Sequence, residues 1–267
     1  MDNSGNQCGP NYQSGVDFKQ LKLHNGAEMI LTKLKNTFVL SVGGSVFAPN
    51  DQDNRIDIQY LHDFEAFIRK QIAKKRRFFI VCGGGYTARQ YRDAAKQAAG
   101  RNLTDEDLDW LGIHATRLNA HLFRTIFRDV AYPWILKHFD MVDKNAVNSP
   151  VVICGGWKPG WSTDYDAALI ANDYHIQTVI NLSNIDQVYD KDPNKFKDAQ
   201  PIKKIHWKDL IALVGSKWTP GLNSPFDPIA CCLAKKIGLK VIIANGHNFA
   251  NLEKILEGKP FTGTEIE

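Results

Sequence analysis

Residues 37–46 read TFVLSVGGSV, a run of strand-forming residues that ends at a pair of glycines. A short β-branched and apolar run without polar alternation is typical of a strand that is buried on both faces. Similar runs follow at 78–82 (FFIVC), 150–154 (PVVIC), 178–182 (TVINL) and 240–245 (KVIIAN). Together they predict the strands of one central sheet.

Helical patterns separate these predicted strands. One begins near residue 57 and has apolar residues at helical spacing, namely Ile58, Leu61, Phe64, Ile68 and Ile72. Further helices are predicted near 86–99, from Thr104 as an N-cap to about 128, from 164, and from about 228. Strands that alternate with helices predict an α/β fold, a three-layer αβα sandwich around a mostly parallel sheet.

Composition narrows the class of protein. The chain has 267 residues, 43% of them hydrophobic, and a formal net charge of +4. Basic residues are scattered apart from KKRR at 74–77, so we expect no nucleic-acid partner. No apolar run is long enough to cross a bilayer, and the five cysteines lack metal-ligand spacing, so we expect a cytoplasmic protein without a membrane partner. The polar start predicts a flexible extension over residues 1–35, followed by a single domain over 36–267.

Three glycine clusters follow three of the predicted strands: SVGGSV at 41–46, VCGGGYTAR at 81–89 and CGGWKPGWST at 154–163. In a parallel sheet these loops emerge at the same carboxyl edge, where ligands bind. Glycine lets backbone amides approach phosphate oxygens, and each loop leads to a helix N-terminus that favours an anion. None matches the P-loop or dinucleotide-binding patterns, so those two classes are disfavoured.

The loop at 154–163 is rich in hydroxyls and aromatics. Its backbone amides, Ser162 and Thr163 could bind anionic or carbonyl groups, and Trp157 and Trp161 could cover a planar base. The alternative is a surface turn that its tryptophans anchor.

The motifs resemble the amino acid kinase superfamily, and within it the uridylate (UMP) kinases of the archaeal branch. Besides the glycine clusters, they are LDWLGIHATRLNAHL at 108–122, NIDQVYDKDP at 184–193, DPIACCLAKKIGLK at 227–240 and GTEI at 263–266. The resemblance covers about residues 37–267 and implies the amino acid kinase fold, with an acceptor-binding lobe over about 36–175 and an ATP-binding lobe over about 176–267. It implies transfer of the γ-phosphoryl group of ATP, as its Mg²⁺ complex, to UMP.

Site residues follow from the resemblance, position by position. The positions that match the ATP site are Gly43, Gly44, Gly85, Arg89, Ser183, Asn184, Tyr189 and Asp192. The positions that match the UMP site are Gly84, Asp109, Trp157, Lys158, Pro159, Gly160, Trp161, Ser162 and Thr163. In the family, the carboxylate at the position of Asp109 receives the sugar hydroxyls. Arg89 suits phosphate because its guanidinium is a forked donor.

Asp164 matches the acidic residue that organises the catalytic cations, and no metal site made of protein ligands alone is predicted. Plainer interpretations stay open for three residues: Asp164 could cap its own helix, Asp109 could be a solvated helix acid, and Tyr189 could be a core aromatic. Asn119 could reach the ligand or only brace its helix.

The sequence departs from the family pattern at several positions. Ser41 stands where many members carry a lysine that stabilises the migrating phosphoryl group, and Tyr86 stands where some archaeal relatives carry another. Lys158, followed by Arg89, is therefore our candidate for the compensating cation. Gln187 replaces a usual glycine and could narrow the nucleotide site or only require a different turn. Ser183 keeps the hydroxyl of the usual threonine.

Two other functions remain compatible with the sequence, because one fold hosts many activities. One is a kinase of another small phosphate or carboxylate. The other is a non-catalytic oligomer that binds nucleotides or anions as a sensor or storage protein. The resemblance also implies a homo-oligomer, a hexamer in many relatives, formed through helices such as 57–74 and the long helix after 104.

Overall fold

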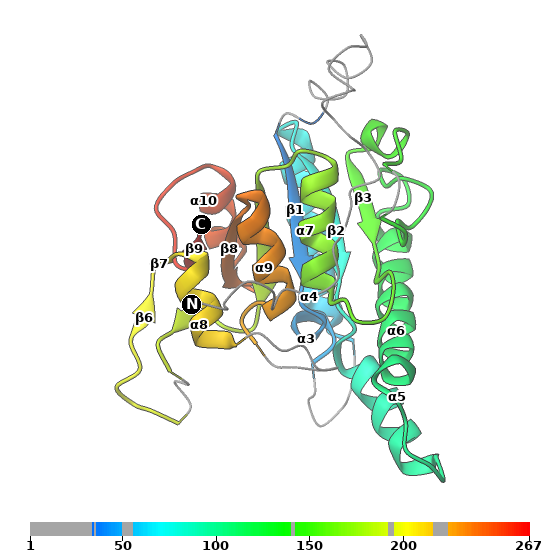
Figure 1. Cartoon of the computed structure of the whole chain (residues 1–267). Helices are drawn as coiled ribbons and strands as arrows, with labels where there is room; N and C mark the ends of the chain where they lie inside the picture. The colour runs from blue at the N-terminus through cyan, green and yellow to red at the C-terminus, as the bar shows by residue number, and fades with distance from the viewer. Residues whose placement is uncertain (1–33, 35, 50–55, 140–141, 192–194, 216–223) are drawn as a thin grey trace.

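A seven-stranded sheet forms the centre of the molecule, with strand order β3-β2-β1-β4-β8-β9-β7 (Figure 1). The computed structural model describes residues 34, 36–49, 56–139, 142–191, 195–215 and 224–267. The predicted extension over 1–35 therefore lies almost wholly outside the described residues. The strands of this sheet are β1 (Thr37–Val42), β2 (Arg77–Cys82), β3 (Val151–Cys154), β4 (Thr178–Ser183), β7 (Lys204–Ile205), β8 (Lys240–Asn245) and β9 (Thr264–Ile266).

The five predicted strands are parallel neighbours. β1 pairs with β2 on one side and with β4 on the other, β3 extends the sheet beyond β2, and β8 extends it beyond β4. Only β9 runs antiparallel to its neighbour β8, at the end where β7 forms the edge. The fold class predicted from the sequence is confirmed. Because the five strands are parallel, the loops that follow them emerge at one edge of the sheet.

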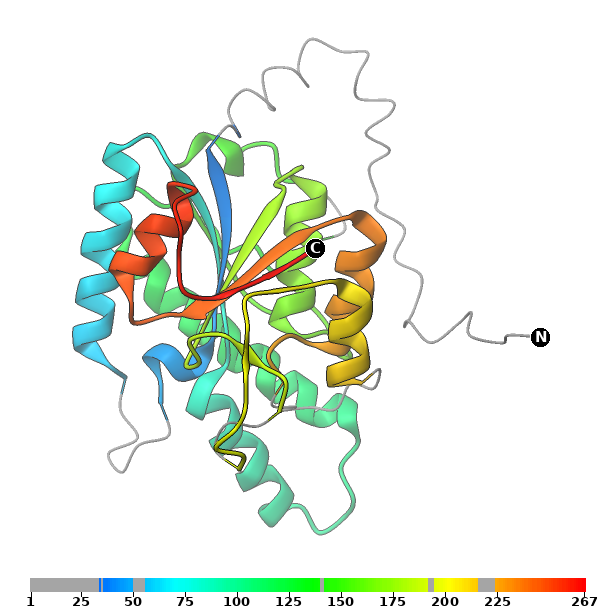
Figure 2. The same cartoon turned by 90° about the vertical axis from the view of Figure 1, so that its left-hand side faces the viewer.

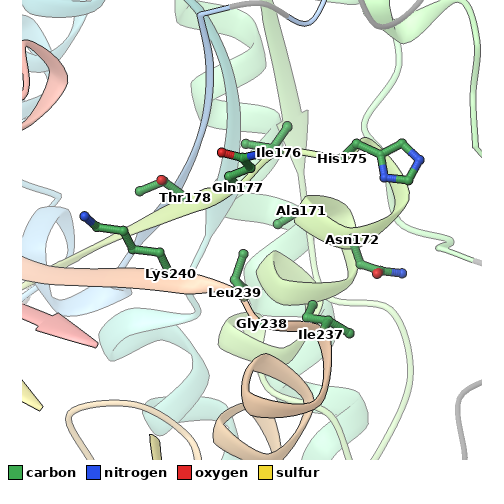
Figure 3. A pocket seen from close by; sticks show the side chains of 10 residues that line it. All are labelled: Ala171, Asn172, His175, Ile176, Gln177, Thr178, Ile237, Gly238, Leu239 and Lys240. Atoms are coloured by element: carbon green, nitrogen blue, oxygen red, sulfur yellow. The ribbon is translucent and has the colours of Figure 1, made fainter. Parts of the chain in front are cut away.

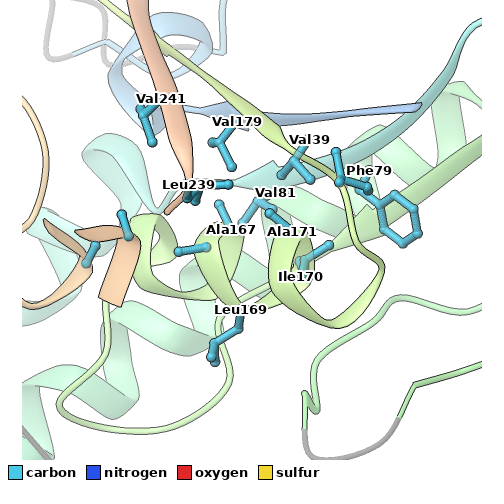
Figure 4. Close-up of a cluster of buried hydrophobic side chains, with 14 of the residues drawn as sticks. Val39, Phe79, Val81, Ala167, Leu169, Ile170, Ala171, Val179, Leu239 and Val241 are labelled. Carbon is cyan, nitrogen blue, oxygen red and sulfur yellow. The ribbon is translucent and has the colours of Figure 1, made fainter. Parts of the chain in front are cut away.

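One face of the sheet is covered by α7 (Thr163–Asp173), α8 (Trp207–Val214) and α9 (Pro228–Ile237). Alternate strand residues such as Val39, Val81 and Val179 point toward this layer, where Ala167 and Ala171 of α7 pack against them (Figure 4). Small residues on α7 let the helix lie close to the strands. Its first turn is thereby fixed above the carboxyl edge of β1 and β4.

The opposite face carries α3 (Gly44–Phe47), α4 (Ile58–Ala73), α6 (Asp105–Ile126) and α10 (Phe249–Leu256). Here Phe64 of α4 packs edge-on against Phe123 of α6 with their ring centroids 5.6 Å apart. The two views together show helices on both sides of the sheet, which completes the three layers (Figures 1 and 2).

α5 (Gly85–Ala98) and the lower part of α6 form a helical hairpin that extends from the carboxyl edge of the sheet (Figure 1). The predicted start of α6 is confirmed, because the side chain of Thr104 accepts from the amide of Asp107, and the Asp107 carboxylate accepts from the Thr104 amide in return. This capping box fixes where the hairpin turns.

The connection between β4 and α8 contains short elements that the sequence did not predict. β5 (Val188–Tyr189) pairs there antiparallel with β6 (Pro201–Ile202). Outside this connection, the one-turn helix η1 (Ala146–Asn148) before β3 was also not predicted. Helices α8 and α10 were not predicted either. Strands of two residues are too short to show a periodic pattern in the sequence. They are held in place by tertiary hydrogen bonds, such as the one that the Val188 amide donates to the Thr264 hydroxyl over 2.8 Å.

A cavity of about 450 Å³ lies at the amino ends of β4 and β8, between the last turns of α7 and α9. Thr178 and Lys240 line it from the strands and His175 lines it from the end of α7 (Figure 3). It lies at the edge of the sheet opposite the glycine loops. Among the described residues, no helix combines the length and apolar character that a bilayer crossing requires.

Candidate functional site

The first two glycine loops meet at the carboxyl edge of β1 and β2. A Cβ atom built on Gly44 would lie 2.0 Å from the backbone nitrogen of Gly85, and one built on Gly83 would lie 2.4 Å from that of Gly44. Both distances are far below a van der Waals contact, so only glycine permits this approach. The predicted convergence of the loops is confirmed for these two.

The end of β4 joins the same edge. The amide of Gly43 donates to the Leu182 carbonyl over 2.9 Å, and the side-chain amide of Asn184 donates to the Ser45 carbonyl over 3.4 Å. Ser183 is the last residue of β4. Five of the residues predicted for the ATP site therefore lie together, namely Gly43, Gly44, Gly85, Ser183 and Asn184.

The other predicted ATP residues are placed less closely. Arg89 is exposed on α5, one turn beyond the glycines. Tyr189 is half-buried on β5, so it is not a fully buried core aromatic. Gln187, two residues before it, is also half-buried. Asp192 lies outside the described residues.

Side chains of α6 form hydrogen bonds with the glycine loops after β2 and β3. The side-chain amide of Asn119 donates to the carbonyls of Gly83 (2.8 Å) and Gly84 (3.2 Å). One turn earlier, the Thr116 hydroxyl accepts from the amide of Gly156 over 2.7 Å. Asn119 therefore braces the loop after β2, a role that neither of its two interpretations named.

Arg117, on the same helix, holds the loop after β3. Its guanidinium donates to the carbonyls of Gly156 (2.9 Å) and Trp157 (2.8 Å). A forked donor suits two successive carbonyls, and these bonds fix the backbone where the loop leaves the sheet. Sequence reasoning missed Arg117, although it adjoins Thr116 in a motif that the family resemblance marked.

Tryptophans anchor the loop after β3, and they hold the candidate catalytic lysine. The Lys158 ammonium lies 4.5 Å from the ring centroid of Trp157 and 4.1 Å from that of Trp161. Trp161 is buried and packs against Tyr165, and it meets Trp157 edge-on. In this arrangement the two indoles hold the cation through their faces, while Pro159 between them stays half-buried.

Asp109 binds the same loop from α6. Its carboxylate accepts from the amide of Gly160 over 2.7 Å. Asp109 is half-buried and lines a cavity, so it is not simply a solvated helix acid. This hydrogen bond links the backbone of the loop after β3 to α6 beside that cavity.

This cavity, of about 130 Å³, lies between the hairpin and the loop after β3. Five of its lining residues were predicted for the acceptor site: Gly84, Asp109, Trp161, Ser162 and Thr163. Sequence reasoning missed the others, among them Arg92 and Gly112. Arg92 follows Arg89 at helical spacing, which was the available signal.

Asp164 lies at the centre of a polar cluster under the first turn of α7. One carboxylate oxygen accepts from the Ser41 hydroxyl and from the side-chain amide of Asn181, both at 3.2 Å, and the other accepts from the Asp227 amide, also at 3.2 Å. Ser162 caps α7, so Asp164 does not. Enclosure of the carboxyl group, and next the charge of Asp227, raise its pKa to about 7.

Two buried aspartates lie in the same region, Asp227 and Asp166, and neither was predicted. Asp227 caps α9 through the Ile229 amide (2.9 Å) and accepts from the Ser162 hydroxyl, and burial raises its pKa. Asp166 accepts from the Trp157 amide over 3.3 Å, while its other oxygen has no hydrogen-bond partner within the described part of the chain. Burial raises the pKa of Asp166 well above its ordinary value. No pattern in the sequence marked Asp166.

The fold and this edge of the sheet agree with one family. The model of the amino acid kinase family matches residues 36–245, and the chain belongs to that family. A uridylate kinase of Thermoplasma volcanium is 35% identical over 235 residues, which is 88% of this chain and 99% of that protein. A uridylate kinase of Methanobrevibacter smithii is 31% identical over 229 residues, 85% of this chain and 97% of the relative.

A solved structure gives the same result. The crystal structure of uridylate kinase from Archaeoglobus fulgidus superimposes with a TM-score of 0.72 at 30% sequence identity. The match covers 86% of this chain and 99% of that one. The described fold is therefore that of this relative over nearly its whole length.

Proposed function

We propose that this protein transfers the γ-phosphoryl group of Mg-ATP to UMP and releases UDP and ADP. The observation that carries the proposal is the cavity beside the glycine loops. Residues predicted for a nucleotide acceptor line it from the loop after β2, from α6 and from the loop after β3. The uridylate kinases among its relatives, which match most of the chain, support the choice of UMP.

The donor's phosphates would lie along the joined loops after β1 and β2. Gly44 and Gly85 are in backbone contact there, so their amides can approach phosphate oxygens without a side chain between. Ser183 at the end of β4 and Asn184 after it border these loops and would contact the ATP. The division into an acceptor lobe over about 36–175 and an ATP lobe over about 176–267 remains part of the proposal, with the loops after β1 and β2 contributing to the ATP site from the first lobe.

The acceptor would occupy the cavity, with its phosphate toward Gly84, Ser162 and Thr163. Gly84 precedes α5 and Ser162 precedes α7, so two helix N-termini favour the anion at that end. Asp109 lies at the other end and would accept from the sugar hydroxyls. Trp161 forms part of the wall of this cavity.

Transfer needs alignment and charge neutralisation rather than a protein nucleophile. An oxygen of the UMP phosphate forms the new bond to the γ-phosphorus, the bond to the β,γ-bridging oxygen breaks, and ADP leaves with the electron pair. The acceptor oxygen is already anionic near neutral pH, so no general base is required. Lys158 and Arg89 are the cations proposed to balance the charge that develops.

The carboxylates of Asp164 and Asp227 suit Mg²⁺, which prefers hard oxygen ligands and is usually held by one or two carboxylates together with substrate phosphates. The Asp227 amide donates directly to Asp164, so the two residues are adjacent. When bound, Mg²⁺ would supply charge neutralisation on the transferring phosphates. Among the described residues there is no cluster of three or more acidic, His or Cys side chains that would hold a metal without ATP.

A turnover assay tests the proposal. Purified protein with Mg-ATP and UMP, CMP, AMP or GMP should release ADP fastest with UMP. ADP release with a different small phosphate or carboxylate, and none with UMP, would show a kinase of another substrate. Nucleotide binding without ADP release from any acceptor would favour the sensor or storage protein.

We also propose a homo-oligomer, with a hexamer as the expected size, and a cytoplasmic location. The exposed apolar side chains of Ile58 on α4 and Leu118 on α6 support assembly through these helices, since 60% and 62% of their surfaces are exposed in the single chain. Light scattering after size-exclusion chromatography measures the oligomer, and cell fractionation measures the location.

A further inference from the structure

Arg92 belongs to the acceptor cavity, although the family motifs do not mark it. Its Nε donates to the Ala88 carbonyl one turn back on α5 over 3.2 Å, which holds the side chain along the helix. One terminal nitrogen of its guanidinium would lie 3.5 Å from a Cβ atom built on Gly112 of α6. The guanidinium group therefore packs over Gly112, at ordinary van der Waals distance from the position of a Cβ atom there.

α6 shows where along the cavity Arg92 lies. Asn119 and Thr116 hold the glycine loops, where the phosphates are proposed to bind, whereas Gly112 faces Arg92 and Asp109 binds Gly160. Seven residues of helix separate Thr116 from Asp109, which is about 10 Å along the axis. Gly112, and with it the Arg92 guanidinium, lies between these two ends, three residues of helix from Asp109 and four from Thr116. The charge of Asp109 acts on Arg92 there.

Among the residues that the structure describes, Arg92 and Asp109 are the only charged side chains that line this cavity. They have opposite charges, and their attraction partly offsets the effect of burial, which lowers the pKa of Arg92. A cavity lined by one strong donor and one strong acceptor suits a ligand group that can both accept and donate hydrogen bonds. A sugar diol is such a group, because each hydroxyl does both.

We propose that Arg92 and Asp109 together recognise the ribose of the acceptor nucleotide, with Arg92 donating to a sugar hydroxyl oxygen while Asp109 accepts a hydroxyl proton. This inference rests on the proposed function, since it assumes a nucleotide in the cavity. Arg92 is then a determinant of selectivity for ribonucleotides over deoxyribonucleotides, a role distinct from the phosphate contacts of the glycine loops. The Ala88 carbonyl occupies only Nε, which leaves the two terminal nitrogens of the fork to face the ligand.

The test compares wild type with Arg92→Met, which keeps an unbranched side chain but removes the donors. Lys96→Met is the matched control, because Lys96 is an exposed cation in the last turn of the same helix. Isothermal titration gives the Kd of each variant for UMP, 2′-deoxy-UMP, 3′-deoxy-UMP and CMP. If Arg92→Met lowers the melting temperature markedly, Arg92→Lys replaces it, since a lysine keeps the charge but loses the fork.

Arg92→Met should weaken UMP and CMP alike, by about tenfold or more, because both carry the ribose and a hydrogen bond from a charged donor is lost. The loss should shrink to about threefold or less for at least one of the deoxynucleotides, and Lys96→Met should change none of the four. Equal losses on all four ligands would place Arg92 at the phosphate, and a loss confined to UMP would place it at the base; either result overturns the inference. Turnover of UMP by the wild type is measured separately, so a failure of the proposed function is distinguished from a failure of this one.

Discussion

The Ser41 hydroxyl donates to a carboxylate oxygen of Asp164 over 3.2 Å. The residue at the position of the family's strand lysine thus contacts the residue at the position of its cation-organising acid. A neutral hydroxyl stabilises the carboxylate less than an ammonium group would. Burial, and next the charge of Asp227, raise the pKa of Asp164 despite this bond. Ser41 brings no positive charge, so our proposal places the compensating cation elsewhere, at Lys158.

Asp164→Asn should lower kcat by at least about a hundredfold while it changes the Kd for UMP by less than about threefold. The reason is that Asp164 contacts Ser41 of β1 and Asn181 of β4 and does not line the acceptor cavity. Steady-state kinetics and UMP titration measure the two quantities. Asp209→Asn, an exposed acid on α8, is the control, and equal losses in kcat and affinity would give Asp164 a purely positional role.

The stability of the ligand-free protein should depend on the protonation of Asp164. Its pKa is about 7 in the folded protein against 3.8 as the ordinary value, so the folded state binds this proton more tightly than the unfolded chain does. The contribution is complete below about pH 4 and is lost as the pH rises through about 7. Melting temperatures between pH 5 and 8 should fall by a few degrees in wild type and less steeply in Asp164→Asn; parallel curves would contradict the pKa assignment.

Lys158→Ala should lower turnover of UMP by more than about tenfold, because it removes the cation proposed to replace the missing strand lysine. Lys158 is exposed and, in the part of the chain that is described, its ammonium group contacts only the faces of two indoles, so the protein should stay folded without it. Lys208→Ala on the exposed side of α8 serves as the comparison. Turnover within twofold of wild type would remove Lys158 from catalysis.

Asn119→Leu should destabilise the protein by about 2 kcal/mol, since it leaves the carbonyls of Gly83 and Gly84 without their donor. It should also weaken the binding of ATP and UMP together, because the braced loop lies between the two proposed sites. Urea unfolding and nucleotide titrations measure both effects. Thr125→Val on the same helix removes only a local bond to the His121 carbonyl and should change stability by less than about 0.5 kcal/mol.

Gly44→Ala should abolish activity, because its methyl group would lie 2.0 Å from the backbone nitrogen of Gly85 and would force the two loops apart. Gly100→Ala is a matched control, since a methyl group there meets nothing within 4 Å. The thermal melt and the turnover of each variant check this. If Gly44→Ala retained more than about a tenth of wild-type turnover, the close approach of the loops would not be required for transfer.

Sequence patterns were sufficient for the elements whose signal is local. The apolar runs at β1, β2, β3, β4 and β8 predicted strands because burial on both faces requires continuous hydrophobic residues. Thr104 marked the start of α6 through its own capping hydrogen bond. The glycine clusters predicted a shared edge, since parallel strands bring their following loops together. The family resemblance then supplied the acceptor residues that the cavity brings together, such as Asp109 and Thr163.

Contacts between distant residues were decided only by the tertiary structure. Asp227 meets Asp164 across 63 positions of sequence, and Arg92 faces Gly112 across the α5–α6 turn, because helices that pack on one sheet bring these side chains together. The roles of Asn119 and Arg117 as braces likewise depend on carbonyls of loops that follow other strands. A sequence pattern shows which neighbours a residue has within its own helix or strand. The packing of helices and strands against one another decides which side chains line the same cavity or lie next to the same buried charge.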